Sequence, residues 1–353
     1  MFAKSSSTRC LAIIPVVVVS VLIVYATLTY NYYFLYVLHP EPTFAIPVGL
    51  LYNFFISLAV WSYFKTLLTE PGFVTEEWSI KAMEEDLGTL CRKCHIKRPI
   101  RAHHCGTTNR CVRRMDHYCP WTGNTIGFEN HRLFILFLQY TFFASITLFG
   151  SALPDIIQLF NGRQSWDKNT RWTTFFDSSY EASNIHLIMF AVTLFIAVTF
   201  GLSVGGLYGT HLYLLFTNNT TLEMGGLFSN SEQFNLGLCN NIEQLYGKFG
   251  IQWFLPIRLS EGKRVCDGYE FPTREDMLLA SDSDFANDLN DEVGKDTKLV
   301  KRGAPGQASN QNKNRMGLVP HKQVSATPIG VSAPAEHDDL ESLSGSEQRL
   351  MNK

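Results

Sequence analysis

Four long stretches of the chain are almost free of charged residues and alternate with polar segments. They run from about 11 to 38, from 44 to 68, from 133 to 153 and from 185 to 216. Each is long enough to cross a hydrocarbon core of about 30 Å, which takes about 20 apolar residues in a helix. A single such run is also typical of a buried core helix or a signal peptide. Four of them predict a mainly α membrane protein with four transmembrane helices.

The same pattern divides the chain into six segments. The four helices form two pairs, and a polar segment rich in Cys and His separates the pairs. After the last helix comes a segment with enough aromatic and aliphatic residues to pack, and then a polar tail. The tail buries too little apolar surface to offset its chain entropy, so it is predicted to be disordered. The segments are 1–10, 11–68, 69–132, 133–216, 217–274 and 275–353.

Basic residues are distributed unevenly between the connecting segments. The loop from 70 to 132 holds ten Lys and Arg residues, whereas the loop between the third and fourth stretches holds Arg163, Lys168 and Arg171 only. Cytosolic loops of membrane proteins carry the excess of positive charge. We therefore expect the Cys-rich loop and both termini to be cytosolic, although a net charge of −2 by itself would suit a soluble protein.

Five of the eight cysteines lie in the central loop. Cytosolic cysteines rarely form disulfides, so this cluster indicates metal ligands or catalytic thiols. Three thiols and one imidazole follow the spacing Cys91-x2-Cys94-x9-His104-x6-Cys111. That is a complete tetrahedral set for structural zinc. The alternative is a few unrelated buried cysteines, but the loop is too polar to fold on an apolar core of its own.

The zinc spacing recurs when it is shifted by fourteen residues. The shifted positions are occupied by Cys105, Thr108, Tyr118 and Thr125. Only Cys105 is a soft metal ligand, and hydroxyl oxygens are poor zinc ligands beside Cys and His. The sequence therefore predicts one zinc ion per chain, with a second site lost as a unit. We interpret Cys105 as a small buried apolar residue.

Cys119 belongs to neither set and is free for covalent chemistry. His117 is near enough in sequence to take its proton, and Asp116 could orient the imidazole, in the usual order of nucleophile, base and orienting group. Taken alone, a Cys two residues from a His favours a different interpretation. A structural cysteine packed beneath a zinc-binding segment explains that spacing at least as well.

The surrounding motifs change this balance. The stretch from Cys91 to Cys105, followed by Arg110-Cys-Val-Arg-Arg-Met-Asp-His-Tyr-Cys-Pro-Trp121 and Asn124, closely resembles the DHHC-type protein S-acyltransferases. Glu70-Pro-Gly72 is similar to the family's Asp-Pro-Gly, and Thr220-Thr221-Leu-Glu223 matches its Thr-Thr-x-Glu. Asn241 to Tyr246, with Trp253 to Pro256, is similar to its C-terminal motif. The resemblance extends from about 11 to 274.

This resemblance implies the activity and the residues that carry it. Cys119 would take a palmitoyl group from palmitoyl-CoA and pass it to a cysteine of a membrane-associated protein. His117 would act as base in both steps, supported by Asp116. Tyr118 departs from the family, where a zinc-binding His stands at that position, and Thr108 and Thr125 replace cysteines. The same comparison thus explains the degenerate second zinc set. Members of the family with an Asp-His-Tyr-Cys core exist, and some are active.

The acyl chain and CoA are assigned candidate contacts. Phe134, Phe137, Thr141 and Ala144 fall on one face of the third helix, and Trp121 could close the cavity at the cytosolic rim. Ordinary packing or lipid contact explains each of these positions equally well. In the family, bulk deep on this helix limits chain length, so the small Ala144 predicts tolerance of chains longer than palmitoyl. Arg98, Arg101 and His103, with Lys97, could meet CoA phosphates, or simply reflect the positive cytosolic side.

The expected partners are the lipid bilayer, acyl-CoA and protein substrates with juxtamembrane cysteines, and no nucleic acid. The expected location is the Golgi, the endoplasmic reticulum or the plasma membrane. Two alternatives remain from other classes: a pseudoenzyme, and a zinc-stabilised membrane adaptor. A transporter is disfavoured because the four stretches hold almost no ionisable residues.

Overall fold

The computed structural model describes residues 6–39, 41–160, 180–224 and 231–279, and it is mainly helical. Among these described residues, four helices are long and apolar enough to cross a membrane, as the hydrophobic pattern predicts. The first is α1 (Ser6–Thr29), which continues as the π-helix η1 (Tyr30–Leu38), followed by α2 (Pro42–Leu68), α4 (His131–Phe160) and α6 (Tyr180–Thr217). Residues 161–179, in the loop predicted between the third and fourth helices, lie outside the described residues.

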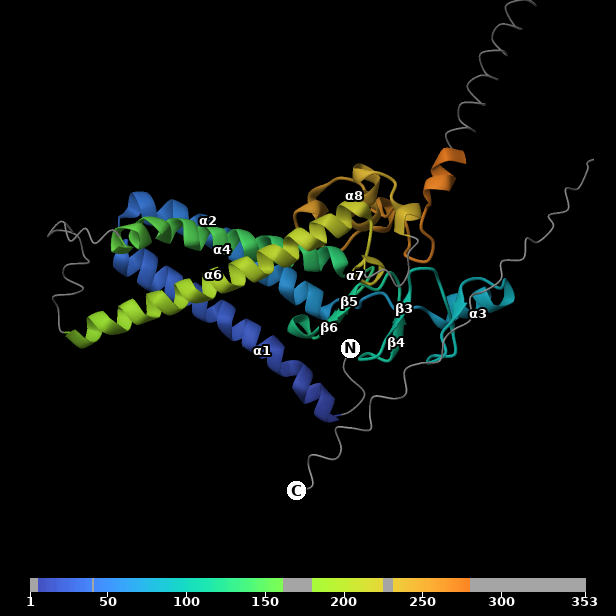
Figure 1. Cartoon of the computed structure of the whole chain (residues 1–353), viewed down its shortest axis with the longest axis horizontal. Helices are drawn as coiled ribbons and strands as arrows, with labels where there is room; N and C mark the ends of the chain where they lie inside the picture. Colours follow the sequence, from blue (N-terminus) through green and yellow to red (C-terminus); the bar gives the residue numbers. More distant parts are fainter. Residues whose placement is uncertain (1–5, 40, 161–179, 225–230, 280–353) are drawn as a thin grey trace, which may run out of the picture. The chain divides into compact units, whose positions relative to one another are not determined.

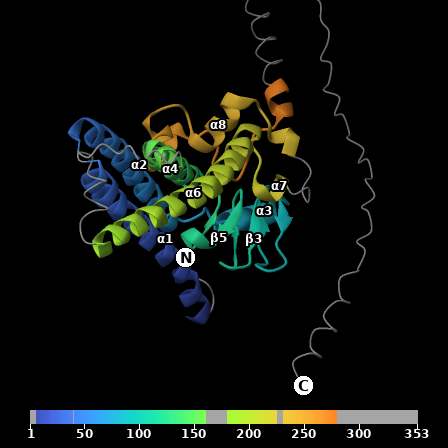
Figure 2. The same ribbon diagram turned by 60° about the vertical axis from the view of Figure 1, so that its left-hand side comes forward.

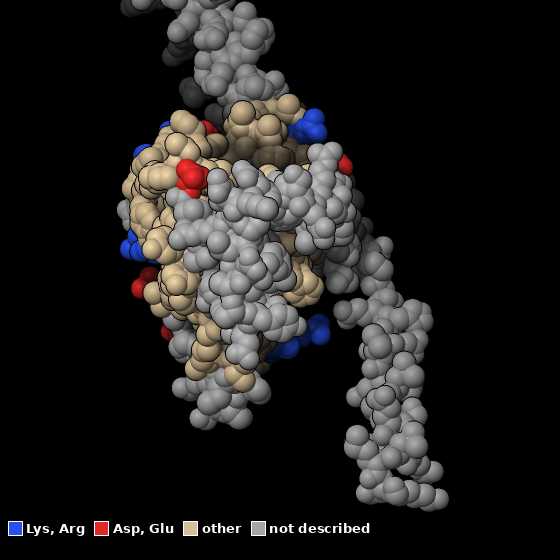
Figure 3. All heavy atoms as spheres, turned by 90° about the vertical axis from the view of Figure 1, so that its left-hand side faces the viewer, with Lys and Arg blue, Asp and Glu red and all other residues tan. Residues whose placement is uncertain are grey.

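Helix α4 is the centre of the bundle, because it packs along α2 on one side and α6 on the other (Figures 1 and 2). Small residues permit this close approach. A Cβ atom on Gly205 of α6 would lie 2.7 Å from the ring of Phe142 on α4. The outward faces are apolar, with Phe195 and Leu202 among the most exposed side chains. Most of the described surface in Figure 3 is likewise uncharged. This surface suits contact with lipid.

The Cys-rich segment lies between α2 and α4 in sequence, as predicted. It begins with α3 (Glu76–Glu84) and continues as three antiparallel hairpins. Their strands pair as β1 (Thr89–Leu90) with β2 (Lys97–Arg98), β3 (His103–Cys105) with β4 (Arg110–Val112), and β5 (His117–Cys119) with β6 (Asn124–Ile126). In the second hairpin His104 faces Cys111, and in the third Tyr118 faces Thr125. The fourteen-residue shift in the sequence is therefore a repeat in the fold.

Side chains from these hairpins hold the end of α2. The Asn124 amide, 1 % exposed, donates to the carbonyls of Thr66 and Thr69 at 3.0 and 2.8 Å. These carbonyls at a helix C-terminus lack intrahelical partners. Gly72 follows with a φ of +93°, which favours glycine, and its carbonyl accepts from Arg113 N at 2.8 Å. The third hairpin is thus fixed to the membrane helix that precedes it.

The segment after α6 packs back on the bundle. It contains α7 (Thr221–Met224), η3 (Ser231–Phe234), α8 (Leu238–Tyr246), η4 (Ile251–Trp253) and η5 (Glu261–Lys263). The Asn241 amide donates to the Phe216 carbonyl at the end of α6, at 2.7 Å. Arg132, near the start of α4, donates to the carbonyls of Gln252 and Ile257. Residues 274–279 are helical, and the rest of the predicted tail lies outside the described residues.

Candidate active site and zinc centre

Cys119 ends strand β5 and begins the short 3-10 turn η2 (Pro120–Thr122). Cys119 is 5 % exposed, and its thiol is close enough to His117 for the imidazole to lower the pKa of Cys119. Nδ1 of His117 lies 2.6 Å from Oδ2 of Asp116. The structure therefore brings the three predicted catalytic residues together in the order thiol, imidazole, carboxylate.

Asp116 is held from the far side by the segment that follows α6. Its side chain is fully buried, and Oδ1 accepts from the backbone N–H of Thr221 at 2.9 Å. The Thr221 hydroxyl donates to the Asp116 carbonyl at 2.7 Å. Residues 105 positions apart thus fix the carboxylate that orients His117. This contact explains physically what the Thr-Thr-x-Glu motif does in this chain.

The electrostatics favour a charged Cys–His pair. Burial opposes both charges, but the hydrogen bonds to Asp116 and Cys119 raise the pKa of His117 to about 9. Burial also disfavours the Cys119 thiolate, yet the hydrogen bonds from His117 and Thr122 leave the pKa of Cys119 lowered. Burial is likewise outweighed at Asp116, where the imidazoles of His131 and His117 lower the pKa. Both shifts favour the thiolate–imidazolium form of the pair over the neutral form.

An apolar cavity of ≈ 560 Å³ opens beside Cys119 and runs between the membrane helices. His117 and Trp121 line its mouth, and the Trp121 side chain is 56 % exposed there. The other candidate acyl contacts also line it: Phe134, Phe137, Thr141 and Ala144. The helical-face argument therefore selected a real wall of the cavity. A thiolate at the mouth of an apolar tunnel suits chemistry on the head of a fatty chain.

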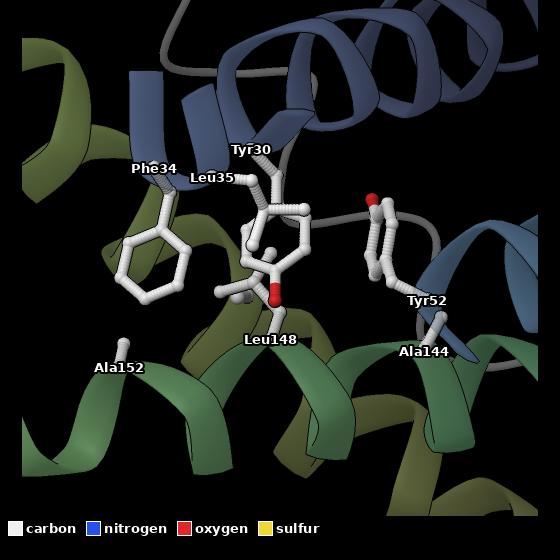
Figure 4. Close-up of a cluster of buried hydrophobic side chains, with 8 residues drawn as sticks. Tyr30, Phe34, Leu35, Tyr52, Ala144, Leu148 and Ala152 are labelled. Carbon is white, nitrogen blue, oxygen red and sulfur yellow. The ribbon is translucent and has the colours of Figure 1, made fainter. Parts of the chain in front are cut away.

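Aromatic residues pack around the part of the cavity wall that carries Ala144. Tyr52 of α2 lines it and lies beside Ala144 of α4 (Figure 4). Behind Tyr52, the ring of Tyr30 packs at a centroid distance of 4.4 Å, and its hydroxyl lies 2.7 Å from Ser151 Oγ. Tyr30 belongs to the π-helix, a rare helical form that is frequent at functional sites. The cavity wall beside the small Ala144 therefore includes an aromatic side chain from a neighbouring helix.

Cys91, Cys94, His104 and Cys111 form one cluster, with their ligand atoms within 4.8 Å of one another. Sγ of Cys94 lies 3.7 Å from Sγ of Cys111 and 3.0 Å from Nδ1 of His104. Two sulfurs bound to one zinc at about 2.3 Å stand about 3.8 Å apart in a tetrahedron. Burial and the adjacent thiols raise the pKa of Cys111, so these thiols need a cation to ionise together. The cluster fits zinc.

The shifted set forms a packed polar cluster instead. Sγ of Cys105 lies 3.1 Å from Oγ1 of Thr125, and Tyr118 packs against the apolar cluster that includes Cys105. Cys105 is 2 % exposed, as its interpretation as a buried residue requires. Within the part of the chain that the structure describes, the shifted set forms no group of three metal-ligating side chains.

The four basic residues predicted to meet CoA do not form one surface patch. The Arg101 side chain is 2 % exposed and makes a bidentate ion pair with Glu223, at 2.7 and 2.9 Å. Nη1 and Nη2 also donate to the Oδ1 and the backbone carbonyl of Asn218. This placement corrects the expectation that Arg101 meets CoA phosphates, because its donors are used inside the protein. Lys97 pairs with Asp86, Arg98 donates to Thr89, and burial lowers the pKa of His103.

Three further residues around the site were not anticipated from the sequence. Arg114, His131 and His211 are each buried, and they approach Asp116 and His117 from three different elements. His211 carried a usable signal, because an ionisable residue in a membrane span usually marks a functional site. Arg114 resembled the other basic residues of the loop, and His131 stood at the edge of an apolar stretch.

Comparison with known proteins assigns the chain to a family. The family of DHHC palmitoyltransferases matches residues 84–225. A probable protein S-acyltransferase 14 of Arabidopsis thaliana is 30 % identical over 261 residues, covering 66 % of this chain and 80 % of the relative. The human palmitoyltransferase ZDHHC2 is 27 % identical over 307 residues, covering 77 % and 78 %. The chain therefore belongs to the DHHC palmitoyltransferase family, as its motifs predicted, and is a protein S-acyltransferase.

Proposed function

We propose that Cys119 carries the acyl group as a thioester and that His117 moves the proton in both halves of the reaction. The observation that supports this most directly is the position of the Cys119 thiol, paired with His117 at the mouth of the apolar cavity. Burial of the fatty chain in such a cavity is favourable by about 0.8 kcal/mol of free energy per CH₂. Its thioester head is then left at Cys119.

In the first half, the Cys119 thiolate attacks the thioester carbonyl of the acyl-CoA. A new S–C bond forms, the C–S bond to CoA breaks, and the leaving CoA thiolate takes the proton from His117. The raised pKa of His117 therefore makes it an acid in this half, where the sequence had suggested a base. In the second half, neutral His117 takes the proton of the substrate thiol. That thiolate attacks the acyl carbonyl, and Cys119 leaves as a thiolate.

The donor, substrates and location follow from the same features. Palmitoyl-CoA is the proposed donor, and the proposed acceptors are cysteines close to the membrane in cytosolic or membrane proteins. Both termini and the Cys-rich segment are cytosolic in this proposal, which rests on the basic residues of the central loop. The compartments proposed are the Golgi, the endoplasmic reticulum and the plasma membrane. The pseudoenzyme and the zinc-stabilised adaptor are less favoured, because the chain retains Asp116, His117 and Cys119 together.

Zinc is the proposed resident metal, and Cys91, Cys94, His104 and Cys111 would hold it. Its role would be structural, because all four ligand positions come from protein side chains. The strands here are only two or three residues long and cannot form a stable sheet alone. The metal would fix the second hairpin, against which the third hairpin packs.

Substitution of Cys119 by Ser tests the nucleophile. Incubation of the purified protein with a labelled palmitoyl-CoA should give a hydroxylamine-sensitive label on the parent and none on Cys119→Ser. The matched control is Cys239→Ser, which changes an exposed thiol on α8 and should label like the parent. Label on Cys119→Ser equal to the parent would make another residue the nucleophile. A parent that binds zinc yet takes no label would favour the pseudoenzyme or adaptor.

The rate of autoacylation should depend on pH with two limbs. It should fall at low pH as the Cys119 thiolate is protonated, and fall again above about pH 9 as His117 loses the proton for CoA. Removal of the imidazole in His117→Ala should slow the reaction by about 10²–10⁴-fold and move the acid limb to higher pH. His103→Gln, at another half-buried histidine, should leave both limbs in place. An unchanged profile for His117→Ala would remove this residue from the mechanism.

Elemental analysis should find one zinc per chain. Cys94→Ala should lose the metal and the autoacylation together, because three ligands bind zinc too weakly to hold the hairpin. Cys105→Ala, in the degenerate set, should keep both. A stoichiometry near two, or metal loss in Cys105→Ala, would mean that the second set still binds metal.

Chain-length preference should respond to the part of the cavity wall that carries Ala144. Ala144→Phe adds bulk to the wall next to Tyr52 and should shift the preference toward shorter acyl-CoAs. Tyr52→Ala should shift it toward longer ones. Competition between acyl-CoAs of different length measures this, with Phe64→Ala on the outer face of α2 as the control. Equal preferences in all three variants would mean that the acyl chain does not reach Tyr52.

A further inference from the structure

Two buried histidines lie behind the catalytic pair and take no part in the proton transfers described above. His131 begins α4 and is 1 % exposed, and His211 lies in the last turns of α6 and is 0 % exposed. Nε2 of His131 lies 3.3 Å from Nδ1 of His211. Both rings are near His117, since the His211 and His117 centroids are 5.8 Å apart. His117 lines the acyl cavity, whereas His211 is fully enclosed.

Arg114 fixes which nitrogens of the two rings carry protons. Its Nη1 lies 3.1 Å from Nδ1 of His131. A guanidinium only donates, so this Nδ1 accepts and the His131 proton is on Nε2. That N–H then donates to Nδ1 of His211, which leaves the His211 proton on its own Nε2. A buried cation thereby sets the tautomer of two neutral rings in series.

The His131 N–H has a second acceptor within reach. Oδ1 of Asp116 lies 4.0 Å from Nε2 of His131. This is the oxygen that accepts from the Thr221 N–H, while Oδ2 serves His117. A bond from His131 to Asp116 would compete with both of these contacts and draw negative charge away from His117. Nδ1 of His211 accepts the hydrogen bond from the His131 N–H and so keeps this N–H away from Asp116.

We propose that His211 is a positioning residue. It accepts the hydrogen bond from the His131 N–H and thereby keeps Asp116 paired with His117. The position of His211 is otherwise unfavourable. Its Nε2 is buried with no hydrogen-bond partner among the described residues, and such groups are costly. A histidine kept for stability would have this nitrogen satisfied. Because Arg114 donates to Nδ1 of His131, the His131 proton lies on Nε2. This N–H needs an acceptor of its own, and Nδ1 of His211 supplies it.

The charged and titratable groups around His117 come from every element that packs on it. They are Asp116 and Cys119 of its own segment, His131 of α4, His211 of α6, and Arg114, beside which Arg101 and Glu223 pair with each other. Loss of the His211 acceptor should therefore weaken the support that Asp116 gives to the His117 imidazolium. The thiolate of Cys119 would lose stabilisation in turn.

The test uses His211→Phe, which keeps a flat ring without an acceptor, and His211→Asn, whose Oδ1 replaces the Nδ1 acceptor. For His211→Phe we expect the acid limb of autoacylation to move to higher pH by about one unit, which is about a tenfold loss of thiolate below the limb. The alkaline limb should move down, with the KM for palmitoyl-CoA and the zinc content unchanged. His211→Asn should restore the parent profile. Thr210→Val, beside His211 on the same helix, is the control.

A second arm does not depend on the folding of His211→Phe: the limbs of His131→Phe alone, which lacks the competing donor, should stay at the parent pH values. His131→Phe removes the competing donor, so in that background His211→Phe should add no further shift of the limbs. Parent-like limbs in His211→Phe, or equally displaced limbs in His211→Asn, would overturn the proposal, as would additive shifts in the double variant. The inference rests on the proposed roles of Cys119 and His117. Label on Cys119→Ser would refute those roles separately, whatever the His211 variants show.

Discussion

The geometry of this enzyme depends on a buried contact between the Cys-rich segment and residues 218–223, which follow α6. Glu223 accepts the N–H of Thr220 at 2.8 Å and so closes a capping box on α7. The same carboxylate pairs with Arg101, and both side chains are at most 5 % exposed. A buried pair gains little net stability, but removal of one partner costs about 3–5 kcal/mol. The contact therefore specifies how the two segments fit, and it places Thr221 against Asp116.

Asn218 extends this contact to the rest of the protein. It ends α6 with a φ of +54°, which asparagine tolerates, and is 1 % exposed. Its side-chain oxygen accepts hydrogen bonds from Arg101 and Arg114. Its side-chain nitrogen donates to the Phe234 carbonyl and to the Gln244 side chain. Two buried cations are thereby balanced by Glu223 and Asp116. The membrane helix, the hairpins and the C-terminal segment thus share one polar network, in which a shift of one part alters the field at His117.

The features that sequence reasoning predicted are those encoded by local pattern. Hydrophobic length predicted four membrane helices, and ligand spacing predicted a zinc set in which the sulfurs of Cys94 and Cys111 lie 3.7 Å apart. The fourteen-residue shift gave a repeat that the structure shows as two hairpins in equivalent register. The prediction that Arg101 meets CoA failed because the partner of Arg101 lies 122 residues away in the sequence. A basic side chain looks the same in sequence whether it faces solvent or a distant carboxylate. Tyr52 was missed because helix packing decides which face meets the cavity.

The hairpin that carries Cys119 has the same register as the preceding hairpin, although different side chains stand at the positions of the zinc-type ligands. Tyr118 faces Thr125 where the preceding hairpin sets His104 against Cys111. The Asn130 side chain accepts from Gly127 N and donates to the Thr125 carbonyl, both at 2.9 Å. With Asn124 bound to the end of α2, these amides supply several of the constraints that a zinc ion would supply one hairpin earlier. They also tie β5 and β6 to the membrane helices directly. Cys119 is thus positioned by the same helices that line the acyl cavity.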